Sequence, residues 1–89
     1  MRFRVFVKKK ILKSLPQWPG NIKERFDVLI AVLEAHGPSG PHAFKNYSKL
    51  GESRYHCHLG YSYVACWTHE KGTISIEVYY AGSRENAPY

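Results

Sequence analysis

Apolar and polar positions along the chain divide it into a short strand, a helical region and a strand-rich second half. Residues 1–8 alternate between apolar and basic side chains, which predicts a strand with one buried face. Residues 9–15 bring three apolar side chains together at helical spacing before Pro16, which predicts a short helix that ends there. The lysines of this helix are expected to point outward.

A second and more regular helical pattern follows the turn at Pro19-Gly20. Apolar side chains recur at i, i+4, i+7, i+8 and i+11 (Ile22, Phe26, Leu29, Ile30 and Leu33). Asn21 with Glu24 three residues later matches a capping box, so Asn21 is expected to cap this helix. His36-Gly37-Pro38 predicts its end, and residues 37–41 are expected to form a rigid loop.

The period changes from 3.6 to 2 after this loop. Residues 44–50 predict an irregular strand, and residues 54–59 and 62–68 predict a hairpin around a two-residue Gly60-Tyr61 turn. Residues 73–81 predict the last strand. The expected fold is α+β with two layers: an N-terminal strand, two helices, then an antiparallel meander of three or four strands. With 89 residues, the chain is expected to form one domain over residues 1–89.

The predicted turn also fixes which side chains share a face of the sheet. Leu59 should oppose Ser62, which places Cys57 beside Val64 and Tyr55 beside Cys66. We expect the helices to cover this face, together with the apolar set of the last strand (Ile74, Ile76, Val78 and Tyr80). The opposite, open face should display a different group of side chains (His56, His58, Tyr63, Trp67 and Glu77).

Composition and charge narrow the class of protein. The chain is 44% hydrophobic and 15% aromatic, which excludes a disordered protein, and no apolar stretch approaches the length of a membrane span. No hydrophobic core of a signal peptide follows the basic N-terminus, and two cysteines without metal-ligand spacing favour a reducing cytoplasm.

The formal net charge is +6, yet residues 1–23 alone carry +7 and the other 66 carry −1. A basic end predicts a phosphate-rich or acidic partner; the alternative is a solvated lysine-rich turn.

Candidate chemistry gathers on the predicted open face. His56 and His58 should point the same way, about 7 Å apart along a strand. They could serve as general acid and base, as two metal ligands, or be merely half-exposed strand residues. The metal interpretation lacks a third ligand at supportive spacing, because His42 and His69 are expected in loops.

Four further residues have competing interpretations. Cys57 and Cys66 are better explained as buried thiols than as a nucleophile or a disulfide. Arg84, just after the last strand, suits bidentate phosphate binding or a surface ion pair. Trp67 could border a base-stacking surface, although packing is the simpler role for it.

Taken together, these residues resemble the RelE/ParE family of toxins from bacterial toxin–antitoxin systems, and especially the RelE-like mRNA endoribonucleases. The resemblance spans the whole chain. Its most recognisable parts are Ser48-Lys49-Leu50-Gly51, Tyr55-His56-Cys57-His58-Leu59, Tyr63-Val64-Ala65-Cys66-Trp67, Val78-Tyr79-Tyr80-Ala81-Gly82-Ser83-Arg84-Glu85 and the Ala87-Pro88-Tyr89 ending.

The resemblance implies roles for individual residues. His56 and His58 match basic positions that act around the scissile phosphate, Arg84 matches an arginine that stabilises phosphate charge, and Tyr89 matches a C-terminal tyrosine that acts as base or stacks on mRNA. One histidine would be the acid, with the other histidine or Tyr89 as base and Glu77 in reserve. A further family arginine falls on Ser62 here, which removes one charge from the phosphate site.

The resemblance also implies a mechanism and partners. The expected reaction is ribosome-dependent cleavage of mRNA by attack of the ribose 2′-OH, with no metal or other cofactor. The expected partners are a cognate antitoxin protein, the ribosome and mRNA, with no membrane. The basic residues expected to bind RNA or the ribosome are Lys8, Lys9, Lys10, Lys13, Lys45, Lys49 and Arg54. The alternatives are a ParE-like inhibitor of DNA gyrase without nuclease activity and a non-catalytic RNA-binding domain.

Overall fold

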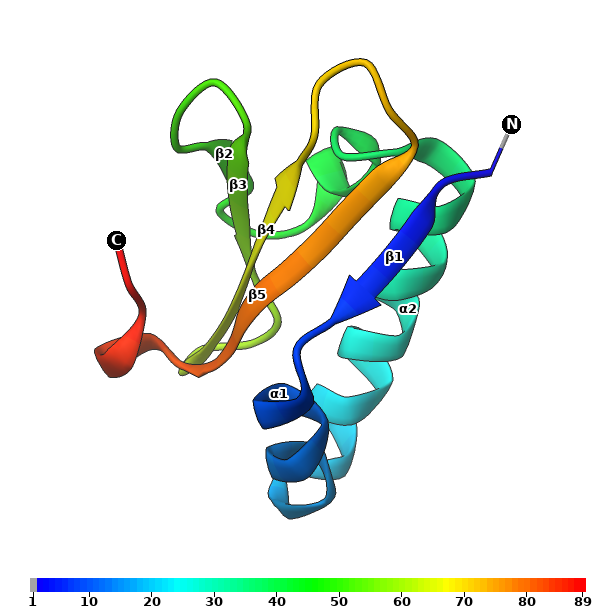
Figure 1. Cartoon of the computed structure of the whole chain (residues 1–89). Helices are drawn as coiled ribbons and strands as arrows, with labels where there is room; N and C mark the ends of the chain where they lie inside the picture. Colours follow the sequence, from blue (N-terminus) through cyan, green and yellow to red (C-terminus); the bar gives the residue numbers. More distant parts are fainter. Residues whose placement is uncertain (1) are drawn as a thin grey trace.

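A five-stranded sheet with the order β1-β5-β4-β3-β2 forms the centre of the computed structural model, which describes residues 2–89 (Figure 1). The strands are β1 (Arg4–Val7), β2 (Ser48–Lys49), β3 (Arg54–His58), β4 (Tyr63–His69) and β5 (Ser75–Ser83). β1 pairs with β5 in parallel, and the other neighbouring strands are antiparallel. The α+β class and the order strand, two helices, meander are confirmed. Met1, which the sequence assigned to the first strand, lies outside the described residues.

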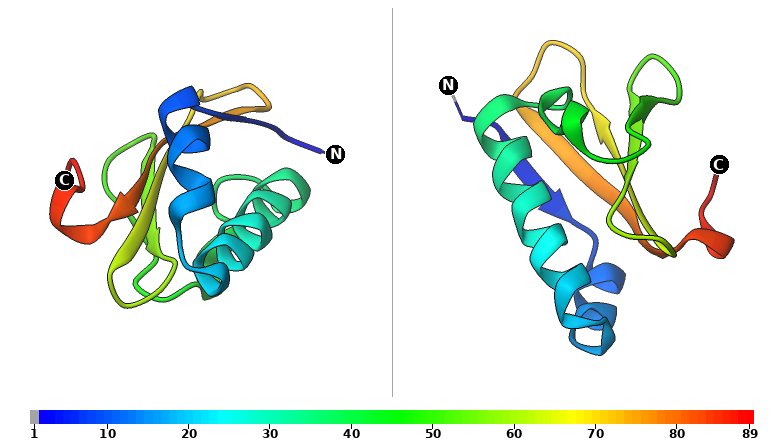
Figure 2. Two further views of the ribbon diagram at one scale, coloured as in Figure 1. Left: turned by 90° about the horizontal axis from the view of Figure 1, so that it is seen from below. Right: turned by 180° about the vertical axis from the view of Figure 1, so that it is seen from behind.

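The two helices lie on one side of the sheet and the C-terminal tail on the other (Figure 2). They are α1 (Lys9–Ser14) and α2 (Gly20–His36), and short 3-10 turns cover Leu15–Gln17, Gly40–Ala43 and Arg84–Asn86. The apolar period of α2 is confirmed, because four of its five predicted side chains are buried (Ile22, Phe26, Leu29 and Leu33). No helix within residues 2–89 has the length and apolar character needed to cross a bilayer.

The predicted capping box at the start of α2 is wrong. The helix begins at Gly20, with Pro19 as its N-cap and no side-chain cap, so Asn21 lies inside the first turn. The backbone N–H groups of Ile22 and Lys23 donate to the carbonyl of Pro19. Proline favours an early start because its ring fixes φ and it lacks an N–H group that would need a partner. The predicted end is confirmed: Gly37 has φ of 84° and its N–H donates to the Leu33 carbonyl.

The predicted two-residue turn between β3 and β4 is also wrong. The N–H of Leu59 donates to the carbonyl of Tyr63, so the loop holds three residues and the register moves by one. His56 opposes Cys66 and Cys57 opposes Ala65. A slip of one residue exchanges the two faces of a strand. Tyr63 and Trp67 therefore turn toward the helices, and Val64 and Cys66 join the histidine face.

Trp67 is fully buried in the helix-side core, so it borders no base-stacking surface. Its indole N–H donates to the carbonyl of Pro38 at 3.1 Å, which ties the loop after α2 to the sheet. Trp18 is also buried, and its ring centroid lies 5.8 Å from that of Tyr63. His69, expected in a loop, is instead the last residue of β4.

A β-bulge in β5 corrects the predicted apolar set of the last strand. Trp67 pairs with Val78 and Cys66 pairs with Tyr80, which leaves Tyr79 as the extra residue. The bulge reverses the alternation, so Ile76, Val78 and Ala81 all reach the core. Tyr80 faces the other way, and Ile74 precedes the strand and is exposed. The irregular strand predicted for residues 44–50 shortens to Ser48–Lys49.

Candidate active site

Two histidines on β3 occupy the sheet face opposite the helices. His56 and His58 have ring centroids 6.0 Å apart. Their side chains are only 9% and 8% exposed, so the expectation that they are solvent-facing is wrong. The C-terminal tail crosses this face and brings the Tyr89 ring 4.6 Å from that of His56 (Figure 2). The histidines therefore sit in a partly desolvated site rather than on an open surface.

Two side chains from the segment before β3 contact the imidazoles. The hydroxyl of Ser48 lies 2.9 Å from Nδ1 of His56, because β2 pairs with β3 in a register that places Ser48 opposite His56. The side-chain nitrogen of Asn46 lies 3.3 Å from Nδ1 and 3.4 Å from Nε2 of His58. Sequence reasoning missed both residues. The sequence shows polar side chains at Asn46 and Ser48, but it does not show that β2 pairs with β3 and so brings them to the histidines.

The pKa of each histidine is lowered from 6.5. Burial is the main cause for His56, and a hydrogen bond to the backbone of Ser48 opposes the shift. Burial also dominates at His58, and the positive charges of His56, Arg84 and Lys45 lower its pKa further. Both imidazoles are therefore mostly neutral at pH 7, which is the form that can accept a proton.

The turn after β5 holds Arg84 near the histidines. The N–H of Arg84 donates to the carbonyl of Ser62, the residue that stands where the family resemblance expects an arginine. The Tyr80 hydroxyl donates to the carbonyl of Ser83 at 2.5 Å, and the Ser83 hydroxyl accepts from the N–H of Glu85. The guanidinium of Arg84 itself is exposed and lies 5.6 Å from the ring centre of Tyr61. A cation here, free of any carboxylate partner within residues 2–89, can bind a phosphate.

Tyr89 is poorly suited to act as a base. Burial is the main cause that raises its pKa above 10, and the Arg84 charge opposes the shift. Its phenol is therefore neutral and holds its proton at neutral pH. The contact with His56 fits a stacking or positioning role better than that of a proton acceptor.

The two cysteines lie on opposite faces of the sheet, which corrects their predicted placement on one face. Cys57 belongs to the helix-side core, whereas Cys66 opposes His56 on the other face, and both are free thiols. Burial raises the pKa of Cys57 to about 12 and that of Cys66 to about 11. Protonated, fully buried thiols are poor nucleophiles, so both residues serve packing.

The predicted RNA-binding residues fall into three groups. Lys45 adjoins the histidines, because its carbonyl accepts the His58 N–H, and Arg54 lies on the same face at the start of β3. Lys49 points to the other face, 5.7 Å from the ring centre of Tyr55. The remaining four are exposed on or beside α1 (Lys8, Lys9, Lys10 and Lys13). Lys8 and Lys10 line a groove of about 720 Å³ that continues along residues 79–83 of β5 to Asn86.

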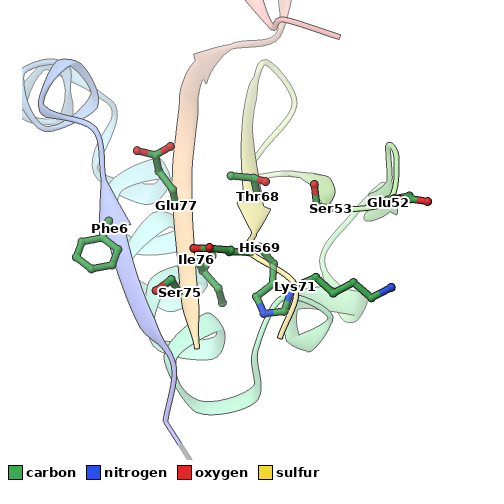
Figure 3. Close-up of a pocket in the computed structure, with 10 residues that line it drawn as sticks. Phe6, Glu52, Ser53, Thr68, His69, Lys71, Ser75, Ile76 and Glu77 are labelled. Carbon is green, nitrogen blue, oxygen red and sulfur yellow. The ribbon is translucent and has the colours of Figure 1, made fainter. Parts of the chain in front are cut away.

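Glu77 lies on the histidine face, as predicted, but in a different depression. It lines a shallow pocket of about 520 Å³ with Phe6, Ser53 and Thr68 (Figure 3). None of the four predicted catalytic residues lines this pocket, and Glu77 pairs with Thr68, which pairs with Arg54 and not with either histidine. Across the described residues 2–89, no three His, Cys, Asp or Glu side chains are grouped to hold a metal ion.

Acidification is expected to destabilise the protein through the two buried histidines. Their native pKa values lie below 6.5, so below about pH 7 the unfolded chain binds more protons than the native state. The free energy of unfolding should therefore fall from pH 7.5 to 5.5. Thermal denaturation at several pH values measures this, and a His56→Gln/His58→Gln variant should show a flatter dependence. An exposed-site His36→Gln control should keep the wild-type slope. If the free energy of unfolding of the double variant depends on pH as strongly as that of the wild type, the two histidines are not the cause of the acid destabilisation.

Comparison with known proteins places the fold. No protein-family model matches the sequence, and no curated protein matches it significantly. A chain of the archaeal RelE–RelB complex from Pyrococcus horikoshii OT3 is 22% identical, with a TM-score of 0.76 over 98% of this chain and 100% of that one. A chain of the YoeB–YefM complex from Staphylococcus aureus is 10% identical, with a TM-score of 0.67 over 94% and 99% of the two chains. A chain of the YoeB dimer from the same organism is 12% identical, with a TM-score of 0.65 over 89% of this chain and 93% of that one.

The chain therefore has the fold of RelE and YoeB toxins over nearly its whole length, and the fold expected from the sequence resemblance is confirmed.

Proposed function

We propose that this protein is the toxin of a toxin–antitoxin system and acts as a ribosome-dependent mRNA endoribonuclease. The observation that carries the proposal is the cluster of His56, His58, Arg84 and Tyr89 on one face of a RelE-like sheet. The cluster supplies two groups that exchange protons near neutral pH beside a cation suited to phosphate. A ParE-like gyrase inhibitor would not need such an acid–base pair.

The proposed reaction needs no metal, because side chains of the cluster can carry out each proton transfer and stabilise the negative charge that develops. A neutral imidazole removes the proton of a ribose 2′-OH, and the 2′-oxygen forms a bond to the adjacent phosphorus. The bond from phosphorus to the 5′-oxygen breaks, and a second imidazole, protonated, gives that oxygen its proton. Arg84 stabilises the extra negative charge of the pentacoordinate transition state. The products are a 2′,3′-cyclic phosphate and a 5′-OH.

The proposed partners follow from the comparisons and from the charge. Two of the matched structures are complexes with a second protein, RelB or YefM, which supports a cognate antitoxin for this chain. The +7 charge of residues 1–23 supports a phosphate-rich target, here the ribosome and its mRNA. Such a toxin acts in the cytoplasm, where ribosomes translate.

Cell-free translation with mapping of mRNA ends tests the proposal. We expect cleavage only of translated mRNA, with 2′,3′-cyclic phosphate and 5′-OH ends, and cleavage should persist with a chelator that binds transition metals but spares magnesium. A parallel assay measures DNA supercoiling by gyrase. Intact mRNA together with blocked supercoiling would overturn the proposal in favour of the ParE-like function.

The lysines of α1 are expected to bind ribosomal RNA rather than the scissile phosphate. All four are exposed (Lys8, Lys9, Lys10 and Lys13). Changing them together to glutamine should weaken ribosome binding and lower the slope of log K against log salt by about 0.7–0.9 for each phosphate that the variant no longer binds. A control that changes two exposed basic residues outside this segment, Arg25→Gln/Lys71→Gln, should leave the slope nearer to wild type. An unchanged slope in the quadruple variant would show that these lysines are only a solvated surface.

A further inference from the structure

We infer that Asn46 and Ser48 divide the roles of the two histidines: Asn46 makes His58 the proton acceptor, and Ser48 makes His56 the proton donor. The inference rests on the proposed ribonuclease function and deepens it. Both residues would act through a histidine, so they are positioning residues. The contacts that carry the inference lie between the segment before β3 and the two imidazoles.

The backbone conformation of Asn46 is unusual for a residue other than glycine. Among the non-glycine residues described, it alone has a positive φ, 56°, in the left-handed region. Asparagine adopts this conformation more readily than most residues, which fits its position in a tight bend. Its own side chain is exposed, so it fills no core space. Next to it, the carbonyl of Lys45 accepts the N–H of His58 and fixes the bend against β3.

The Asn46 contact favours the unprotonated form of His58. The amide nitrogen of Asn46 only donates, so of the two His58 ring nitrogens, 3.3 and 3.4 Å away, it can bond only to one that presents a lone pair. A protonated imidazole has two N–H groups and no lone pair, and would face another donor. The other charged or titratable neighbours of His58 are His56, Lys45 and Arg84, and none is an acid. Val64 on β4, opposite His58, is apolar. Every neighbour therefore disfavours the protonated ring.

His56 has a partner that its protonated form can keep. The Ser48 hydroxyl lies 2.9 Å from Nδ1 and can accept a hydrogen bond from that N–H in either protonation state. This contact leaves Nε2 of His56 available to give up a proton. His56 also lies beside the neutral phenol of Tyr89, the imidazole of His58 and the protonated Cys66 on β4. Of the two histidines, His56 is therefore better able to hold the proton that the leaving 5′-oxygen needs.

NMR titration of the imidazole protons tests the Asn46 contact without any cleavage assay. Asn46→Asp places an acceptor where the donor was, so the pKa of His58 should rise by about one pH unit or more, and that of His56 should change less. Asn46→Gly retains the positive φ and removes the donor, so the pKa of His58 should rise by a smaller amount. Asn21→Asp, an exposed change in the first turn of α2, is the charge-matched control and should leave both values in place. An unchanged or lower His58 pKa in Asn46→Gly would overturn the inference.

The pH dependence of single-turnover cleavage tests the assignment of roles. The limb that rises with pH should follow the His58 titration, and it should move to higher pH in Asn46→Asp by the amount that NMR measures. A rising limb that follows His56 instead would overturn the assignment. If the wild-type protein cleaves no mRNA at all, the proposed function and the role assignment fall together. The NMR titration then still decides whether Asn46 controls His58.

Discussion

Replacing His58 with glutamine is expected to slow single-turnover cleavage of ribosome-bound mRNA by about 100-fold or more. Loss of a general acid or base typically costs this much, and glutamine cannot accept a proton at neutral pH. His56→Gln should cost a similar factor, because the mechanism needs both a proton acceptor and a proton donor. The wild-type pH–rate profile should bend between about pH 5 and 8, and each variant should lose the limb that its own histidine controls.

Burial of the histidines makes a folding control necessary for both variants. Each side chain is less than a tenth exposed, so substitution is expected to lower the melting temperature, unlike a change at an exposed site. Cleavage is therefore compared well below the melting temperature of the least stable variant. His36→Gln, at the exposed end of α2, should retain wild-type cleavage. Folded His56 and His58 variants that both cleave at the wild-type rate would exclude these residues as the acid and base.

Replacing Arg84 with alanine is expected to slow cleavage by roughly 100- to 1,000-fold, the usual cost of removing a group that stabilises transition-state charge. The side chain is exposed, and its backbone N–H, which binds the Ser62 carbonyl, survives the change, so folding should be unaffected. The pH profile should keep its bend, because arginine moves no proton. Since the Arg84 charge lowers the pKa of His58, the rising limb should move to higher pH in Arg84→Ala.

Two companion variants separate the roles that Arg84 could have. Arg84→Lys retains the charge and loses the bidentate geometry, so its rate should lie between those of wild type and Arg84→Ala. Arg25→Ala removes an exposed arginine from α2 on the opposite side of the sheet and should cleave normally. A normal rate in Arg84→Ala would move the phosphate-binding role to Lys45 or Arg54.

Periodicity in the sequence determined the class of fold. The i, i+4, i+7 spacing in α2 and the change to period 2 after Gly37 depend on local geometry alone, so both survive in the structure. Gly37 ended the helix as predicted, because the positive φ it adopts is costly for other residues. Single-residue choices at the ends of elements were less predictable. The sequence predicted Asn21 as the N-cap of α2, whereas the helix begins at Gly20 with Pro19 as its N-cap.

The faces of the meander required the tertiary structure. The loop between β3 and β4 holds three residues in place of two, which exchanges the two faces of β4. The bulge at Tyr79 shifts the alternation of β5, so that Ala81 faces the core as Ile76 and Val78 do. Both are adjustments of one residue, which strand periodicity cannot detect because its period is two. His56 and His58 kept their shared face regardless, since both are on one strand two residues apart.

The sequence by itself determined that two imidazoles share a face, that an arginine follows the last strand, and that positive charge gathers near the N-terminus. Each of these follows from local spacing along the chain. Only the tertiary structure decided that the tail crosses the histidine face, that Ser48 and Asn46 contact the imidazoles, and that Glu77 lines a pocket without the predicted catalytic residues. These features depend on contacts between segments far apart in sequence or on the exact register of neighbouring strands. Burial and neighbouring charges set the pKa of a histidine, so its protonation state can be inferred only from the folded structure, in which those neighbours are in place.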